Sequence, residues 1–160
     1  MLTRDWQAAL DAVVKKEGTF TLVFHPYGWS KSEQLVALID HAVAKHGKKV
    51  KFLTFREALE RLNKNLLGGQ SLRAADGQDN GVRLLDVNND GYLDVVVGNE
   101  GVRQTRVWLP QRRSWAVGGF PVPIVTTGEH GKRAETGVRF GVLRPDGMAS
   151  LLVQDRKSVV

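Results

Sequence analysis

Residues 82–99 read VRLLDVNNDGYLDVVVGN, and this stretch decides the fold expected for the second half of the chain. Two apolar runs flank a loop whose oxygen-bearing side chains recur at close spacing: Asp86, Asn88, Asp90 and Asp94. The apolar runs are typical of short strands, and an Asp-Gly pair favours a tight turn between them. The loop is therefore either a cation site or a solvated turn.

The spacing of the loop favours a cation site. Calcium takes 6–8 oxygen ligands from carboxylates, amide groups and backbone carbonyls. Such ligands stand at positions 1, 3, 5 and 9 of the loop, in Asp86, Asn88, Asp90 and Asp94, and Tyr92 at position 7 offers its backbone carbonyl. Gly91 allows the sharp turn between them. We predict a structural Ca²⁺ at these five residues; a polar turn over residues 89–91 needs fewer of them and is the alternative.

The flanks of the loop separate it from an EF-hand, because strands surround it and Val97 stands where an EF-hand has glutamate. The pattern D-x-N-x-D-G-x-x-D, followed by an apolar run and Gly98, resembles the FG-GAP (VCBS-type) repeat. That family forms blades of integrin-α-like β-propellers. The resemblance implies a calcium ion that holds an inter-strand loop, a structural or recognition role with a carbohydrate or protein ligand, and an extracytoplasmic setting.

The repeat resemblance extends along the second half. Residues 105–123 resemble the rest of a blade. A second unit is expected at 137–154, where Pro-Asp-Gly keeps the turn but the carboxylates before and after it are missing. We therefore expect no calcium in the second unit. Closed propellers have roughly 4–8 blades, so residues 81–160 are expected to form about two incomplete blades.

The first half follows another pattern. Helical periodicity over residues 4–18, 30–46 and 55–67 alternates with apolar runs at 19–24 and 50–55, which predicts parallel strands joined by crossovers. Capping boxes are expected at Ser30–Glu33 and Thr54–Glu57. The buried face of the second helix is expected to consist of Leu35, Leu38, Ile39, Ala42 and Val43.

Residues 6–66 resemble the C-terminal end of a polysaccharide deacetylase (NodB-homology) barrel. The run Leu-Val-Phe-His ending at His25 is similar to the late motif that supplies a general acid in that family. The resemblance implies a parent enzyme acting on amide C–N bonds of amino sugars, with His25 as the acid and Tyr27 and Trp29 as an aromatic wall. A partly buried histidine at a strand end is the alternative.

The early T-F-D-D and H-x-x-x-H motifs of the deacetylases are missing. His41 and His46 are five residues apart and are not expected to share a helix face. The metal of such a site is therefore not encoded in this chain, and the chain is not expected to be an active enzyme by itself.

The fold class expected is α+β in two parts: a partial (β/α) barrel segment over residues 1–67, a linker over 68–80 and all-β propeller-like blades over 81–160. Two apolar parallel strands need neighbours, so we expect further domains in a longer parent chain.

Composition narrows the function further. The 160 residues contain no cysteine, which excludes disulfides and thiol nucleophiles. The net charge of +6 is spread over the chain, so no nucleic-acid partner is expected. No apolar run approaches the roughly 20 residues of a membrane helix, and no signal peptide is evident. Three hypotheses follow: a calcium-binding β module, the catalytic part of a deacetylase, or an interaction module with an empty loop.

Overall fold

The computed structural model describes residues 2–25, 28 and 30–154. It consists of two compact units, Met1–Thr54 and Phe55–Val160, which are described separately below. Residues 55–67 thus group with the strands. The sequence predicted a division after residue 67 instead. Which domains of a parent protein these parts belong to stays a prediction.

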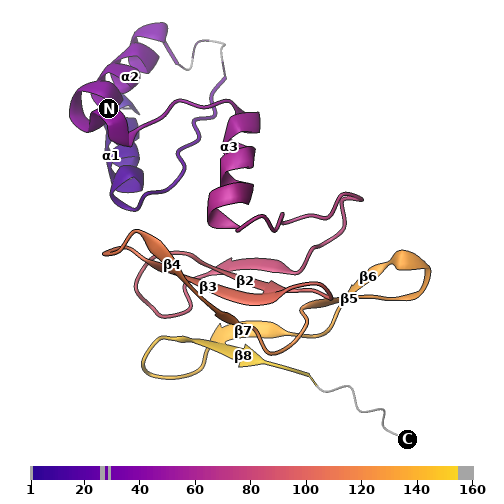
Figure 1. Cartoon of the computed structure of the whole chain (residues 1–160). Coiled ribbons are helices and arrows are strands. Elements are labelled where there is room, and N and C mark those ends of the chain that lie inside the picture. The colour runs from indigo at the N-terminus through magenta and orange to yellow at the C-terminus, as the bar shows by residue number, and fades with distance from the viewer. Residues whose placement is uncertain (1, 26–27, 29, 155–160) are drawn as a thin grey trace, which may run out of the picture. The chain divides into compact units, whose positions relative to one another are not determined.

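The first unit is a pair of helices. Helix α1 (Leu2–Lys15) lies beside α2 (Ser32–His46), which continues into the short 3₁₀ turn η1 (Gly47–Lys49) (Figure 1). Their contact surface contains the buried side chains of Leu10, Leu38 and Ala42. The flanking side chains that complete this core are Trp6, Val14, Phe20, Leu22 and Val50.

The two ends of α2 are capped in different ways. The helix ends at Gly47, whose positive φ of 52° glycine adopts without a steric cost. Its start differs from the prediction, because Lys31 is the N-cap and its backbone N–H donates to Oε1 of Gln34 at 2.9 Å. The predicted capping box at Ser30–Glu33 is therefore wrong by one residue.

The predicted strands of the first unit do not form. Residues 19–25 and 50–54 are extended but pair with no other strand among the described residues. Phe20 and Leu22 turn toward the helices, while the intervening Val23 is 86% exposed. A buried parallel strand needs hydrogen-bonded neighbours, and the described residues supply none. The predicted partial barrel is thus a helical pair with extended connections.

The outer side of α2 is also more apolar than predicted. Leu38 and Ala42 are buried, but Ile39 and Val43, expected in the core, are exposed together with Val36. Among the described residues of this unit, α1 is the helix that packs against α2, and one partner covers only one side of a helix.

The second unit is built from antiparallel strands. A four-stranded sheet has the order β1-β2-β3-β4 and consists of β1 (Val82–Leu85), β2 (Asp94–Gly98), β3 (Arg103–Leu109) and β4 (Ser114–Gly119). Two separate hairpins follow: β5 (Val125–Thr127) with β6 (Arg133–Glu135), joined through the turn η3 (Glu129–Gly131), and β7 (Arg139–Val142) with β8 (Ala149–Leu152).

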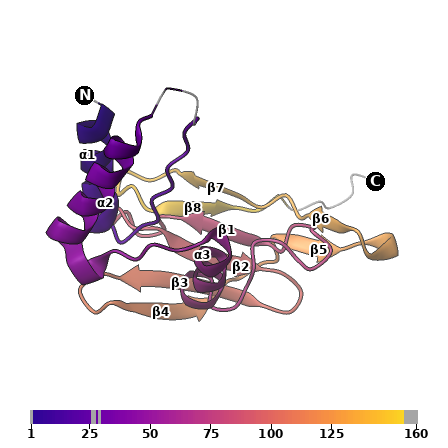
Figure 2. The ribbon, with the colours of Figure 1, turned by 90° about the horizontal axis from the view of Figure 1, so that it is seen from above.

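Strand β2 is the centre of this unit because both of its faces are covered. Val95 and Val97 point to one face, where Leu67 packs on them, and Val96 points to the other. Leu67 follows the helix α3 (Phe55–Arg61) and its wider π-helical end η2 (Leu62–Leu66). Figure 2 shows α3 lying over the sheet. Burial on both faces explains the uninterrupted run of three valines.

The β5–β8 region covers the opposite face of the sheet. Val96 packs there in a buried cluster with Phe120, Ile124, Val125 and Val138, and Phe140 and Leu151 of the β7–β8 hairpin lie against the same cluster. In Figure 1 this hairpin lies beneath the sheet. The arrangement is layered, with one sheet between helix and hairpin, so no propeller closure is seen among the described residues. The fold class is mixed α+β.

Candidate functional site: the loop between β1 and β2

The loop that joins β1 to β2 is a closed hairpin connection. Its outermost strand pair is Leu85 and Asp94, which lie opposite each other in the antiparallel register. Asn89 and Gly91 have φ of 60° and 79°, in the left-handed region that lets the chain reverse. The loop thus turns within the span predicted from its sequence.

Asp94 is the buried anchor of the loop. Its side chain is fully buried, and each carboxylate oxygen accepts a backbone N–H: Oδ2 from Val87 at 2.9 Å and Oδ1 from Trp108 at 2.7 Å. Burial raises the pKa of Asp94 above its usual value, the two hydrogen bonds oppose that rise, and the negative charges of Asp90 and Asp86 add to it. A nearby cation would favour the ionised form.

Asp86 and Asp90 hold the loop backbone. Asp86 accepts the N–H groups of Asp90 at 3.1 Å and Gly91 at 2.7 Å, one on each oxygen. Asp90 accepts the N–H of Tyr92 at 2.9 Å and the side-chain amide of Asn88 at 3.0 Å. Both carboxylates thus bind groups of the loop itself, although Asp90 is exposed.

Asn88 has a buried side-chain oxygen that lacks a hydrogen-bond partner. This atom is Oδ1, while Nδ2 of the same side chain donates to Asp90. An unsatisfied buried carbonyl oxygen costs about 1–3 kcal/mol, which a cation ligated by that oxygen would offset.

The five predicted ligand residues therefore share one loop, but its three carboxylates are not gathered around a point. Among the described residues, the set of three or more His, Asp or Glu side chains whose ligand atoms all lie within 4.8 Å of one another is Asp11, His41 and His46. In the loop, Asp86 and Asp90 are engaged with N–H groups instead. The donors are all oxygen atoms, as a hard divalent ion requires.

A contact that the sequence did not predict holds the loop from outside. Nδ2 of Asn89 donates to the backbone carbonyl of Asp146 at 3.2 Å, and the N–H of Ala149 donates to the carbonyl of Val87 at 3.0 Å. The loop is thus attached to the β7–β8 hairpin. The Pro-Asp-Gly turn of that hairpin was visible in the sequence, but its position beside the loop was not.

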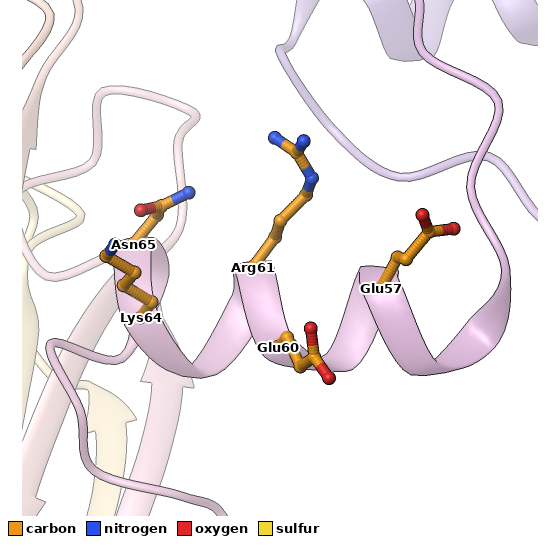
Figure 3. Close-up of a pocket in the computed structure, with 5 residues that line it drawn as sticks. All are labelled: Glu57, Glu60, Arg61, Lys64 and Asn65. Atoms are coloured by element: carbon orange, nitrogen blue, oxygen red, sulfur yellow. The ribbon is translucent and has the colours of Figure 1, made fainter.

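The predicted general acid, His25, has an exposed side chain. His25 follows the segment 19–24, and Tyr27 and Trp29 lie outside the described residues. The roles predicted for these residues stay predictions. A shallow hollow elsewhere, beside α3 and η2, is lined by exposed side chains of that helix alone, which Figure 3 shows spread along it: Glu57, Glu60, Arg61, Lys64 and Asn65.

The sequence missed one cluster of potential ligands. His41 and His46, which were not expected to meet, both approach Asp11 of α1. The available signals were two histidines in the last turns of α2 and an aspartate on the neighbouring helix. Spacing along α2 alone could not find the cluster, because the third residue comes from α1.

Comparison with known proteins bears on the second unit. Residues 80–109, from just before β1 to the end of β3, match the family model of the FG-GAP repeat. No curated protein and no solved structure shows a significant match to the chain. No comparison supports the predicted resemblance of residues 6–66 to a deacetylase. None of the described helices has the length and hydropathy needed to cross a membrane. The chain therefore carries an FG-GAP repeat at residues 80–109, which indicates a β module with a structural or recognition role.

Proposed function

We propose that the FG-GAP repeat binds a calcium ion in the loop from Asp86 to Asp94, and that the ion stabilises the module for recognition of a carbohydrate or protein ligand. The observation that carries the proposal is the buried, unpaired Oδ1 of Asn88. The other side chains of the predicted ligand set, Asp86, Asp90 and Asp94, are carboxylates, which have no proton to donate to this oxygen when ionised, and this favours a cation as its partner.

Charge supports the same assignment. Burial makes the ionised form of Asp94 costly, and the negative charges of Asp90 and Asp86 add to that cost. Bound calcium supplies two positive charges and a shell of 6–8 oxygen atoms, which would offset this repulsion. Asn88 and the three carboxylates are the side chains that would hold it, with the carbonyl of Tyr92 as the backbone ligand.

The position of the loop explains why an ion there would stabilise the whole module. Asp94 links the end of β1, the start of β2 and β3 through its two hydrogen bonds. Asn89 and Val87 link the same loop to the β7–β8 hairpin. A rigid loop therefore supports both layers, which favours a structural rather than a catalytic ion.

The proposal includes an extracytoplasmic setting. Calcium sites of extracellular modules bind with dissociation constants of about 10⁻⁴–10⁻³ M, which suits a loop that supplies oxygen ligands from a short surface turn. A loop of this affinity would be filled only where calcium is abundant.

Calorimetric titration with calcium tests the proposal. One ion per chain is expected, with weaker binding of magnesium because Mg²⁺ demands smaller, near-octahedral geometry. Asn88→Ala and Asp90→Asn should each weaken binding at least tenfold. The control is Asp146→Asn, which changes a carboxylate in the neighbouring turn and should leave the affinity unchanged. Absence of calcium binding, or equal losses in the control, would refute the assignment.

A further inference from the structure

We propose that Asp11, His41 and His46 form a second metal site, in the helical unit, for a borderline divalent transition-metal ion such as Zn²⁺. The proposal is independent of the calcium loop, which lies in the other compact unit and offers oxygen ligands alone.

The three side chains converge on one oxygen. Nε2 of His41 lies 2.8 Å from Oδ1 of Asp11, and Nε2 of His46 lies 2.6 Å from the same atom. The three ligand atoms all lie within 4.8 Å of one another. The two rings meet edge to face, with centroids 6.1 Å apart. Two helices therefore bring two imidazoles and a carboxylate to one point.

The cluster is shielded but accessible. The side chains of His46 and Asp11 are 13% and 28% exposed. Partial burial limits competition from water, and the remaining exposure leaves a route for an ion to enter. The packing of Leu10 of α1 against Leu38 and Ala42 of α2 fixes the helices on which the ligands stand. The ligands are thus attached to a preformed frame.

Without metal, hydrogen bonds from the two imidazole rings to Asp11 hold the cluster together. An ionised carboxylate only accepts, so both imidazoles donate an Nε2–H to Oδ1 of Asp11. These bonds, together with the ammonium of Lys45 at 2.7 Å from Oδ2, hold the pKa of Asp11 well below its usual range; the Lys45 bond contributes most. Metal binding requires each neutral ring to move its proton to Nδ1 and present the Nε2 lone pair.

The geometry needs only a small adjustment. Zinc–nitrogen and zinc–oxygen bonds of about 2.0–2.2 Å in a tetrahedron place ligand atoms about 3.3 Å apart. The contacts of His41 and His46 with Asp11, at 2.8 and 2.6 Å, would therefore lengthen by about 0.5 and about 0.7 Å, which side-chain torsions of partly exposed residues allow.

The ligand types select the metal. Imidazole nitrogen suits zinc, copper and nickel, whereas calcium and magnesium require oxygen shells, and the chain has no cysteine to favour a softer ion. Three protein ligands leave the fourth tetrahedral position to water. Lys45 competes with the ion because its charge sits on the other oxygen of Asp11, and its side chain is 54% exposed. The alternative is that these side chains form a metal-free cluster of ion pairs that only holds α1 and α2 together.

Zinc calorimetry on the full chain, without a polyhistidine tag and at constant calcium, distinguishes a zinc site from a metal-free cluster of ion pairs. His41→Gln, His46→Gln and Asp11→Asn should each lower zinc affinity at least tenfold. The other two of the four histidines are matched controls: His25→Gln and His130→Asn should bind as the wild type does. Asparagine is chosen at residue 130 because its φ is 59°. Lys45→Met should tighten binding by removing the competing charge.

A measurement on the wild-type chain guards against misfolded variants. Zinc should shift the imidazole ring NMR signals of His41 and His46 and leave those of His25 and His130, identified from the folded control variants, in place. The site is refuted if zinc does not bind, if the four histidines respond alike, or if the three cluster variants bind zinc normally. Unchanged or weaker affinity in Lys45→Met would refute ligation by Asp11.

Discussion

The buried carboxylate of Asp94 accepts the backbone N–H of Trp108 at 2.7 Å and so joins β2 to β3 beyond the last residues paired in their ladder, Val95 and Arg106. Its second oxygen accepts the N–H of Val87, just beyond β1. One side chain therefore substitutes for backbone pairing on both sides of the central strand.

Asp94→Asn should destabilise the second unit even without calcium. An amide has one acceptor oxygen, so one of the two buried N–H groups would face an NH₂ donor and remain unsatisfied, at a cost of about 1–3 kcal/mol. Urea unfolding in chelator measures the loss. Asp90→Asn is the comparison, because Asp90 is exposed and its change should cost less. Equal stability of Asp94→Asn and the wild type would show that the two hydrogen bonds are dispensable.

Gly98→Ala should disrupt the end of β2. A Cβ on Gly98 would lie 2.8 Å from the backbone nitrogen of Ile124, which itself donates to the Gly98 carbonyl at 2.7 Å. Backbone must then move, at a cost of about 1–3 kcal/mol. Gly118→Ala in β4 is the matched control, since a Cβ there meets nothing within 4 Å. Similar unfolding free energies for the two variants would contradict the close approach at Gly98.

Leu67→Ala tests whether the segment after α3 belongs to the sheet. Leu67 is 2% exposed and packs with Val82, Val95 and Val97, so its truncation should cost about 2–5 kcal/mol in urea unfolding. Leu59→Ala, at a residue 57% exposed on α3, should change stability by less than about 0.5 kcal/mol. A small effect at both residues would mean that the strands fold without this segment.

The ion pair of Asp79 with Arg83 should make stability depend on pH. Two hydrogen bonds, at 2.9 and 2.7 Å, lower the pKa of Asp79 below its unfolded value of about 3.9. The unfolded chain then binds the proton first, so this contribution is complete above about pH 5 and declines as pH falls through the folded pKa. The stability difference between wild type and Asp79→Asn should be constant above about pH 5 and shrink as pH falls from about 5 toward 3. A constant difference would contradict the pairing.

The sequence predicted those parts of the fold that are specified by residues close together along the chain. The ligand spacing from Asp86 to Asp94 and the valines of β2 predicted a strand-loop-strand unit, and the structure has it, because a hairpin is specified by neighbouring residues. The same reasoning placed strands at 19–24 and 50–55 and was wrong there. Apolar periodicity states what a segment needs to bury, not whether a pairing strand is present.

Contacts between segments that are distant along the chain could not be predicted from the sequence. Asn89 reaches the carbonyl of Asp146, and His41 and His46 reach Asp11, in each case across an element whose placement depends on packing. The spacing of His41 and His46 indicated that they point apart on α2. It held no information about a carboxylate on α1 that both can reach.

Thermal unfolding of the second unit with calcium and with chelator tests the central claim most directly. A site in the loop predicts a rise in the unfolding midpoint that grows with calcium concentration, equivalent to about 2.7 kcal/mol at a hundredfold excess over the dissociation constant. Asn88→Ala should reduce this rise strongly, while Asp146→Asn retains it. An identical midpoint in saturating calcium and in chelator would contradict the account.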